Sequence, residues 1–138
     1  MMTLKNKFLT GVVAGSLALS LLPSEAAAQS MSPMRGKVKS FTDSYALKVY
    51  PANPYDHRIR IEVKAYDANF RPLNNVRISP SNFTLGGQAN RQVTVVVPFN
   101  GKKTSRVRIC TESVPFPGKA SNNIKAQICG KFIGERRN

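Results

Sequence analysis

The stretch HRIRIEVKAYD, residues 57–67, decides the fold class of this 138-residue chain. Its apolar side chains stand at every second position from Ile59 to Ala65, and arginine, glutamate or lysine fills the positions between them. A period of two places the two sets on opposite faces of an extended chain. We therefore predict an antiparallel strand with one face in a core and the other in water.

Six further stretches show the same alternation and complete the predicted strands. They are 34–41, 44–51, 75–79, 91–98, 104–111 and 123–132. Turn-forming pairs separate them, and Asn100-Gly101 is typical of a tight β-hairpin. No stretch after residue 28 has the spacing of an amphipathic helix. Short strands at this spacing predict an all-β fold, a seven-stranded immunoglobulin-like β-sandwich in which residues 29–138 form a single domain.

Residues 1–28 have the pattern of a secretory signal peptide. Two lysines precede an uncharged, mostly apolar run over 8–22, and three alanines at 26–28 offer the small residues that a signal peptidase requires. The run is shorter than the roughly 20 residues that span a bilayer, which disfavours the alternative of a membrane anchor. We expect cleavage after Ala28, a mature protein without a membrane span, and a periplasmic location.

The composition favours a binding protein over an enzyme. The chain has 21 Lys and Arg against 7 Asp and Glu, a formal net charge of +14, and one His. With few carboxylates and a single histidine, the chain has few side chains that could act as general acids or bases. The sequence also lacks a nucleophile elbow and a glycine-rich phosphate loop. It therefore predicts no enzymatic activity, no cofactor and no metal site.

The excess of basic residues has two interpretations. They either keep the sheet faces in water or capture an anionic partner, such as a peptide carboxylate, an acidic protein or a surface polysaccharide. Nucleic acid is disfavoured because the chain is expected to be exported and has no pattern of stacking aromatics.

Cys110 and Cys129 fall on the last two predicted strands. Each shares a strand face with basic residues, Arg106 and Arg108 beside Cys110 and Lys131 beside Cys129, so both thiols should point outward from one sheet. If the two strands are neighbours, the thiols can face each other, and export favours a structural disulfide. Two alternatives are weaker: a redox-active pair lacks the Cys-x-x-Cys spacing, and a zinc site lacks a fourth ligand.

Several segments resemble the first domain of PapD-like periplasmic pilus chaperones. They are ISPSNFTLGGQ at 78–88 with RQVTVVVP at 91–98, the stretch 104–115 that ends in CTESVP, and ICGKFI at 128–133. The resemblance covers residues 31–135 and rests on the order and spacing of these motifs. It implies the same sandwich and, as in some members of the family, a disulfide at the positions of Cys110 and Cys129.

The resemblance also implies a binding site for another polypeptide. In the family, a basic pair from the first and last strands grips the C-terminal carboxylate of a pilus subunit, and Arg35 and Lys131 stand at the matching positions. The last strand of the family offers alternate apolar side chains that complete the subunit's sandwich, which here would be Ile124, Ala126 and Ile128.

Together these features predict an exported, non-catalytic protein that binds a secreted protein subunit. It would act as a periplasmic chaperone or assembly factor for pilus or other surface-appendage subunits. The competing interpretation is a structural or adhesive β-sandwich module of the cell surface that binds an anionic partner or a polysaccharide.

Overall fold

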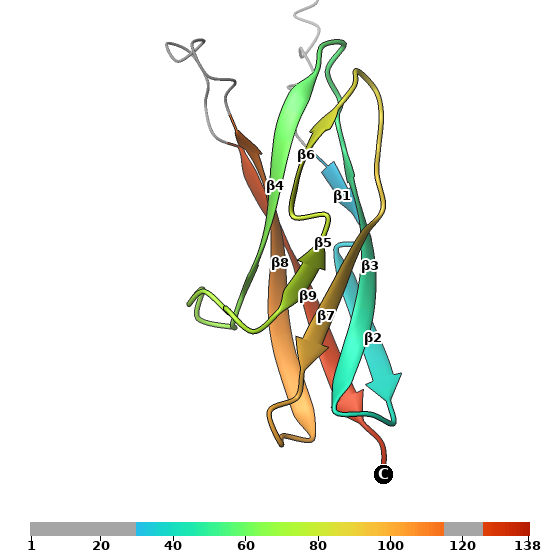
Figure 1. Ribbon diagram of the computed structural model, residues 1–138, viewed down its shortest axis with the longest axis vertical. Coiled ribbons are helices and arrows are strands. Elements are labelled where there is room, and N and C mark those ends of the chain that lie inside the picture. The colour runs from blue at the N-terminus through green and yellow to red at the C-terminus, as the bar shows by residue number, and fades with distance from the viewer. Residues whose placement is uncertain (1–29, 115–125) are drawn as a thin grey trace, which may run out of the picture.

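Residues 30–114 and 126–138 are described by a computed structural model, in which they form two β-sheets packed face to face (Figure 1). The predicted signal peptide, residues 1–28, lies outside these ranges. The described residues contain no helix, and hence none that is long and apolar enough to cross a membrane. The predicted all-β, immunoglobulin-like sandwich is confirmed.

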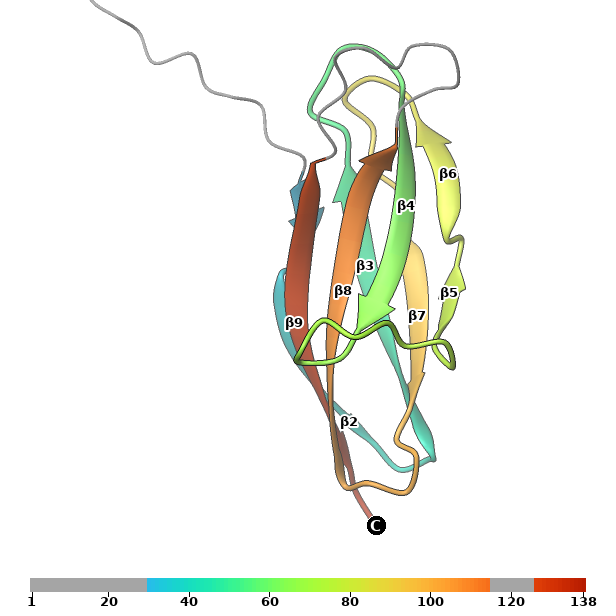
Figure 2. The same cartoon turned by 90° about the vertical axis from the view of Figure 1, so that its left-hand side faces the viewer.

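Nine strands build the two sheets. In chain order they are β1 (Ser30–Ser32), β2 (Arg35–Ser40), β3 (Ser44–Ala52), β4 (Ile59–Tyr66), β5 (Arg77–Ser79), β6 (Asn82–Leu85), β7 (Val93–Pro98), β8 (Thr104–Val114) and β9 (Gln127–Arg136). One sheet has the order β1-β3-β7-β5 and the other the order β2-β9-β8-β4-β6. Strands β2 and β9 are parallel neighbours, and the other pairs are antiparallel. Figure 2 views the molecule with β9, β8 and β4 in front.

Two stretches of extended chain are each divided between the two sheets. The first breaks after β1, which pairs with β3, and continues as β2, which pairs with β9. The other breaks after β5, which pairs with β7, and continues as β6, which pairs with β4. Pro33 and Pro80 stand at the breaks, and proline has no N–H to donate to a ladder. The sequence analysis missed β1 and β6 because each is only a few residues long.

The last strand lies four residues further along the chain than predicted. The expected range was 123–132, whereas β9 covers Gln127–Arg136. The inward-facing positions of β9 alternate between large side chains and glycine. A Cβ atom at Gly134 would lie 2.3 Å from the Tyr45 ring. Glycine carries no apolar signal in the sequence, so a strand that uses glycine to admit a neighbour's ring escapes a search for alternating apolar residues.

The Asn100-Gly101 turn has the expected backbone but does not make a hairpin. Asn100 and Gly101 adopt positive φ angles of 52° and 77°, and the Lys102 N–H donates to the Phe99 carbonyl at 3.0 Å. The turn joins β7 to β8, which belong to different sheets. The hairpin prediction is wrong because both strands bury apolar faces against the same core, so they stack across it instead of pairing.

Apolar side chains from both sheets fill the space between them. The Tyr45 and Phe99 rings close one end of this core, with centroids 5.0 Å apart. The Tyr45 hydroxyl donates to the Ser105 carbonyl at 3.2 Å, which links β3 to β8 across the sandwich. Burial raises the pKa of Tyr45, although a hydrogen bond with the Ser105 side chain opposes the shift, so the phenol stays protonated at neutral pH.

We predict that Gly134→Ala destabilises the protein by about 1–3 kcal/mol, because the added methyl group displaces a ring that the core holds on all sides. Urea unfolding of the purified protein measures the loss. Gly86→Ala is the matched control, since a Cβ atom there meets nothing within 4 Å. Equal stabilities for the two variants would show that the Tyr45 ring is not confined by this close approach.

Candidate functional site

Three basic side chains form one row across the five-stranded sheet. Arg35 of β2 is the register partner of Lys131 of β9, and Lys131 is also the partner of Arg108 of β8. Arg108 and Lys131 point away from the core, since the residues that follow them, Ile109 and Phe132, are buried, and Arg35 is exposed. Adjacent strands lie about 4.8 Å apart, so the row spans about 10 Å. The structure thus brings together the two basic residues that the sequence singles out.

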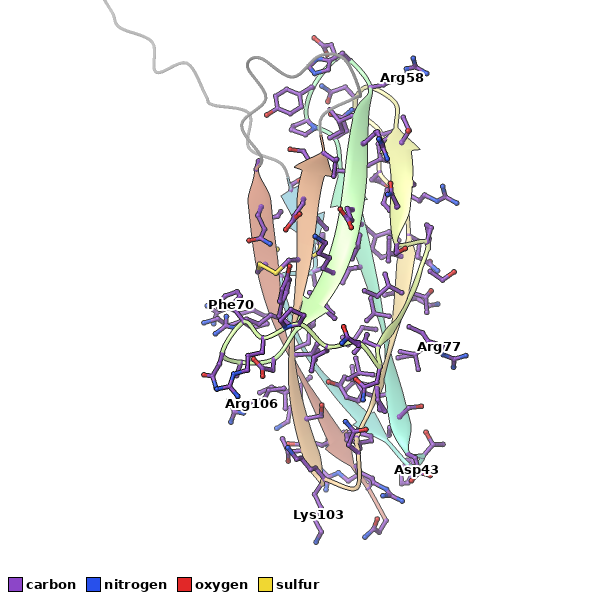
Figure 3. The ribbon with its side chains drawn as sticks, turned by 60° about the vertical axis from the view of Figure 1, so that its left-hand side comes forward. Asp43, Arg58, Phe70, Arg77, Lys103 and Arg106 are labelled. Carbon is purple, nitrogen blue, oxygen red and sulfur yellow. A yellow bond between two sulfur atoms is a disulfide. The ribbon has the colours of Figure 1, made fainter. Side chains whose placement is uncertain are left out.

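The row lines a pocket of about 540 Å³ on the outer face of this sheet. A fourth cation, Arg106, reaches it from β8 two residues before Arg108, and Ala68 reaches it from the loop that follows β4. This loop runs in front of β8 and β9 (Figure 2), and its Phe70 lies on the same side of the molecule as Arg106 (Figure 3). The pocket therefore has a sheet as its floor and a loop as one wall.

Contacts with the loop fix the side chain of Arg108. Its Nε–H donates to the Ala68 carbonyl at 3.3 Å, and its guanidinium carbon lies 4.4 Å from the centroid of the Phe70 ring. The loop itself is closed by Asp67, whose Oδ1 accepts hydrogen bonds from the N–H groups of Asn69 at 2.8 Å and Arg71 at 2.9 Å. A cation over an aromatic face is attracted to it, so Phe70 holds this guanidinium at the pocket.

The carboxylates of the described residues are engaged elsewhere. Asp67 closes the loop, Asp43 pairs with Arg136, Glu62 and Glu112 with Lys64, and Glu135 with Lys37 and Arg137, while Asp56 accepts from Gln88. The Lys37 ammonium, 2.7 Å away, holds the pKa of Glu135 below its usual range. In the described ranges no carboxylate forms an ion pair with any of the four pocket cations, so their charge is available to an anionic ligand.

The predicted disulfide is present in the next row of the same sheet. Cys110 and Cys129 are register partners with Cα atoms 4.0 Å apart and are joined through their sulfur atoms. Their strand face is the outward one, as predicted, but Cys110 is fully buried between Cys129 and its other register partner, Lys64. No group of metal-ligating side chains occurs in the part of the chain that the structure describes.

The apolar residues expected to serve a partner are only partly described. Ile124 lies outside the described residues. Ala126 precedes β9, and its carbonyl accepts from the Ser113 N–H at 3.0 Å. Ile128 is half-buried and packs against the core of its own chain. The described pairing places β2 beside Lys131–Arg136 only, so among the described strands positions 127–130 of β9 pair with β8 alone.

Sequence analysis missed Arg106, Arg108 and Phe70 as members of the site. A signal existed for the arginines: once Cys110 is paired with Cys129, counting two residues back along β8 and two forward along β9 places Arg108 opposite Lys131. No pattern in the sequence indicates that Phe70 contacts Arg108, because a loop alone makes this contact.

We predict that Cys110→Ala/Cys129→Ala lowers the free energy of unfolding by about 3 kcal/mol, because the disulfide closes a short loop in the unfolded chain. Urea titrations of the oxidised protein and the double variant measure the difference. Intact-mass measurement with and without reduction establishes that the starting material is oxidised. Superimposable unfolding curves would contradict a stabilising role for the disulfide.

The fold of this chain can be compared with the folds of known proteins. No protein-family model and no curated protein matches the sequence. Among solved structures, the E. coli chaperone DraB superposes with a TM-score of 0.64 at 17% identity, over 79% of this chain and 55% of that one. A chain from the complex of the Salmonella enterica SafA pilin with the SafB chaperone gives a TM-score of 0.63 at 18% identity, over 79% and 54%.

A third match has the same fold over nearly its whole length. WR4, a C. elegans MSP family member, superposes with a TM-score of 0.52 at 11% identity, over 80% of this chain and 99% of that one. By contrast, the chain spans about half the length of the chaperone structures it matches. The described residues have the immunoglobulin-like fold of PapD-like pilus chaperones.

Proposed function

We propose that this protein is an exported, non-catalytic binding protein that holds the C-terminal end of a secreted polypeptide, as a chaperone or assembly factor for pilus or surface-appendage subunits. The observation that carries the proposal is the register of Arg35 with Lys131 inside a basic pocket. Export, cleavage after residue 28 and a periplasmic location belong to the same proposal and rest on the sequence pattern of residues 1–28.

The two cations suit the capture of a carboxylate. Arginine presents a planar fork that matches both oxygens of a carboxylate, and lysine adds a compact positive charge one strand away. Hydrogen bonds to charged groups are worth about 1.5–3 kcal/mol each, so losing one weakens binding about tenfold or more. A chain end anchored here would have its position along the sheet fixed.

The strand edge next to the anchor suits the capture of an extended chain. Positions 127–130 of β9 offer main-chain groups on the side that β2 does not reach, and added strands bind through such groups. The carboxylate anchor would set the register of the added strand, and Ala126 and Ile128 would contribute apolar side chains beside it. Ile124 belongs to the same proposed surface.

The matched structures share the fold of this chain and include several chaperones, which supports the proposed function. The matched structures include a pilin bound to a chaperone and a chaperone–tip adhesion subunit pre-assembly complex. The competing function is a structural or adhesive module, since a shared sandwich fold does not by itself imply chaperone activity and also occurs in WR4, a C. elegans MSP family member. Co-purification separates the two, because a chaperone brings down a secreted subunit in equimolar amount and an adhesive module binds glycan or itself.

We predict that Arg35→Ala and Lys131→Ala each weaken capture of the co-purified subunit about tenfold or more, because each removes a charge-assisted hydrogen bond. The thermal midpoint should change little, since both side chains are exposed. Titration calorimetry with the purified subunit measures the affinity.

Arg58→Ala is the control, because Arg58 is exposed at the far end of β4 from the pocket (Figure 3). If all three substitutions weaken binding equally, and added salt does the same, the attraction is diffuse and a specific carboxylate anchor is ruled out.

A further inference from the structure

We propose that the pocket recognises two negative groups, and therefore selects a partner whose C-terminal residue is acidic. In this arrangement Arg35 and Lys131 hold the terminal carboxylate, while Arg106 and Arg108 hold the carboxylate of the last side chain. The inference rests on the proposed function and names the chemical class of its ligand.

The number of cations in the pocket points to two anionic groups. Arg35, Lys131 and Arg108 are direct neighbours across three strands, and like charges placed opposite each other destabilise a sheet. One terminal carboxylate contacts the part of this row that lies over β2 and β9. The two arginines of β8 remain without a counter-ion in the described residues, so a second anionic group completes the charge balance.

Arg108 is already oriented for binding. Its Nε is occupied by the Ala68 carbonyl and one face of the guanidinium by the Phe70 ring. These contacts leave its two Nη nitrogens, which have no acceptor among the described residues. A guanidinium that is already oriented loses less conformational freedom when it binds a carboxylate.

Phe70 has an unusual backbone conformation. This residue has a φ of 59°, which is uncommon for a bulky side chain. The Asp67 side chain imposes the tight loop, and Phe70 remains 52% exposed, so burial does not explain the conformation. Strained residues of this kind gather at binding sites. Here the strained residue positions an arginine of the pocket.

The spacing fits a single residue with two carboxylates. Lys131 and Arg108 are register partners on adjacent strands, whose backbones run about 4.8 Å apart. The side chain of one glutamate or aspartate covers this distance from its own terminal carboxylate. A terminal acidic residue therefore places one carboxylate over β9 and the other over β8.

The test uses four fluorescein-labelled peptides that share one alternating Val-Thr segment. They end in Glu or Gln, each as the free acid or the amide, and binding is followed by fluorescence anisotropy. The proteins are the wild type, Arg35→Gln, and Arg106→Gln/Arg108→Gln. Arg58→Gln/Arg77→Gln is the control, because it removes the same charge from exposed sites away from the pocket (Figure 3).

We expect the wild type to bind the Glu free acid about tenfold or more tightly than the Gln free acid. Arg106→Gln/Arg108→Gln should abolish this preference and keep the preference for free acid over amide. Arg35→Gln should do the reverse. The control should leave both preferences unchanged.

Two results separate the inference from the proposed function. Equal affinities of the wild type for the Glu and Gln free acids, with the amides weaker, overturn the inference and leave the proposed carboxylate anchor standing. Equal affinities for acids and amides, or no binding of any peptide, overturn both.

A second variant tests the contribution of the loop. Asparagine tolerates positive φ better than phenylalanine, so Phe70→Asn should leave the thermal midpoint unchanged or raise it. It should nevertheless reduce the preference for terminal Glu severalfold, because Arg108 loses its support. An unchanged preference would contradict the role given to Phe70.

Discussion

The parallel pairing of β2 with β9 is the constraint on which the site depends. It places Arg35 beside Lys131, although the two residues come from opposite ends of the described chain. The antiparallel pairing of β8 with β9 then adds Arg108 to the same row, and the disulfide one row away fixes that register covalently. A slip of one residue in either pairing would turn its side chains to the opposite face. The basic pocket is thus a product of strand register.

Charge is distributed in a way that keeps this pocket basic. The acidic residues of the described ranges lie at the sheet ends, in loops or beside Lys64, where each forms an ion pair or accepts a hydrogen bond. Lys37 and Glu135 form an ion pair beyond Arg35 and Lys131, between the same two strands. No carboxylate of the described residues pairs with the four cations that line the pocket, so their charge acts together in one hollow, where it can attract a small anionic group.

The sequence predicts what simple alternation encodes. The strand at 57–67, the all-β class and the Cys110–Cys129 pair follow from the period of two. The sequence does not predict features that depend on a missing group. Proline, which has no N–H, divides two stretches of chain between the sheets, and Gly134, which has no side chain, leaves room for the Tyr45 ring. The sequence also does not predict the pocket wall, because the contact between Phe70 and Arg108 depends on the path of a loop. The roles of Arg35 and Lys131 in binding remain predictions, although their proximity is now seen.

The two divided strands have a mechanical consequence. β1 and β5 are the outer strands of one sheet, and their continuations β2 and β6 are the outer strands of the other. Continuous backbone therefore connects the two sheets along both long sides of the sandwich. Sliding one sheet over the other would pull on both backbone connections and break hydrogen bonds on both sides at once. A domain of this build should resist shear along its strands, the direction in which an added strand would be drawn out of its edge.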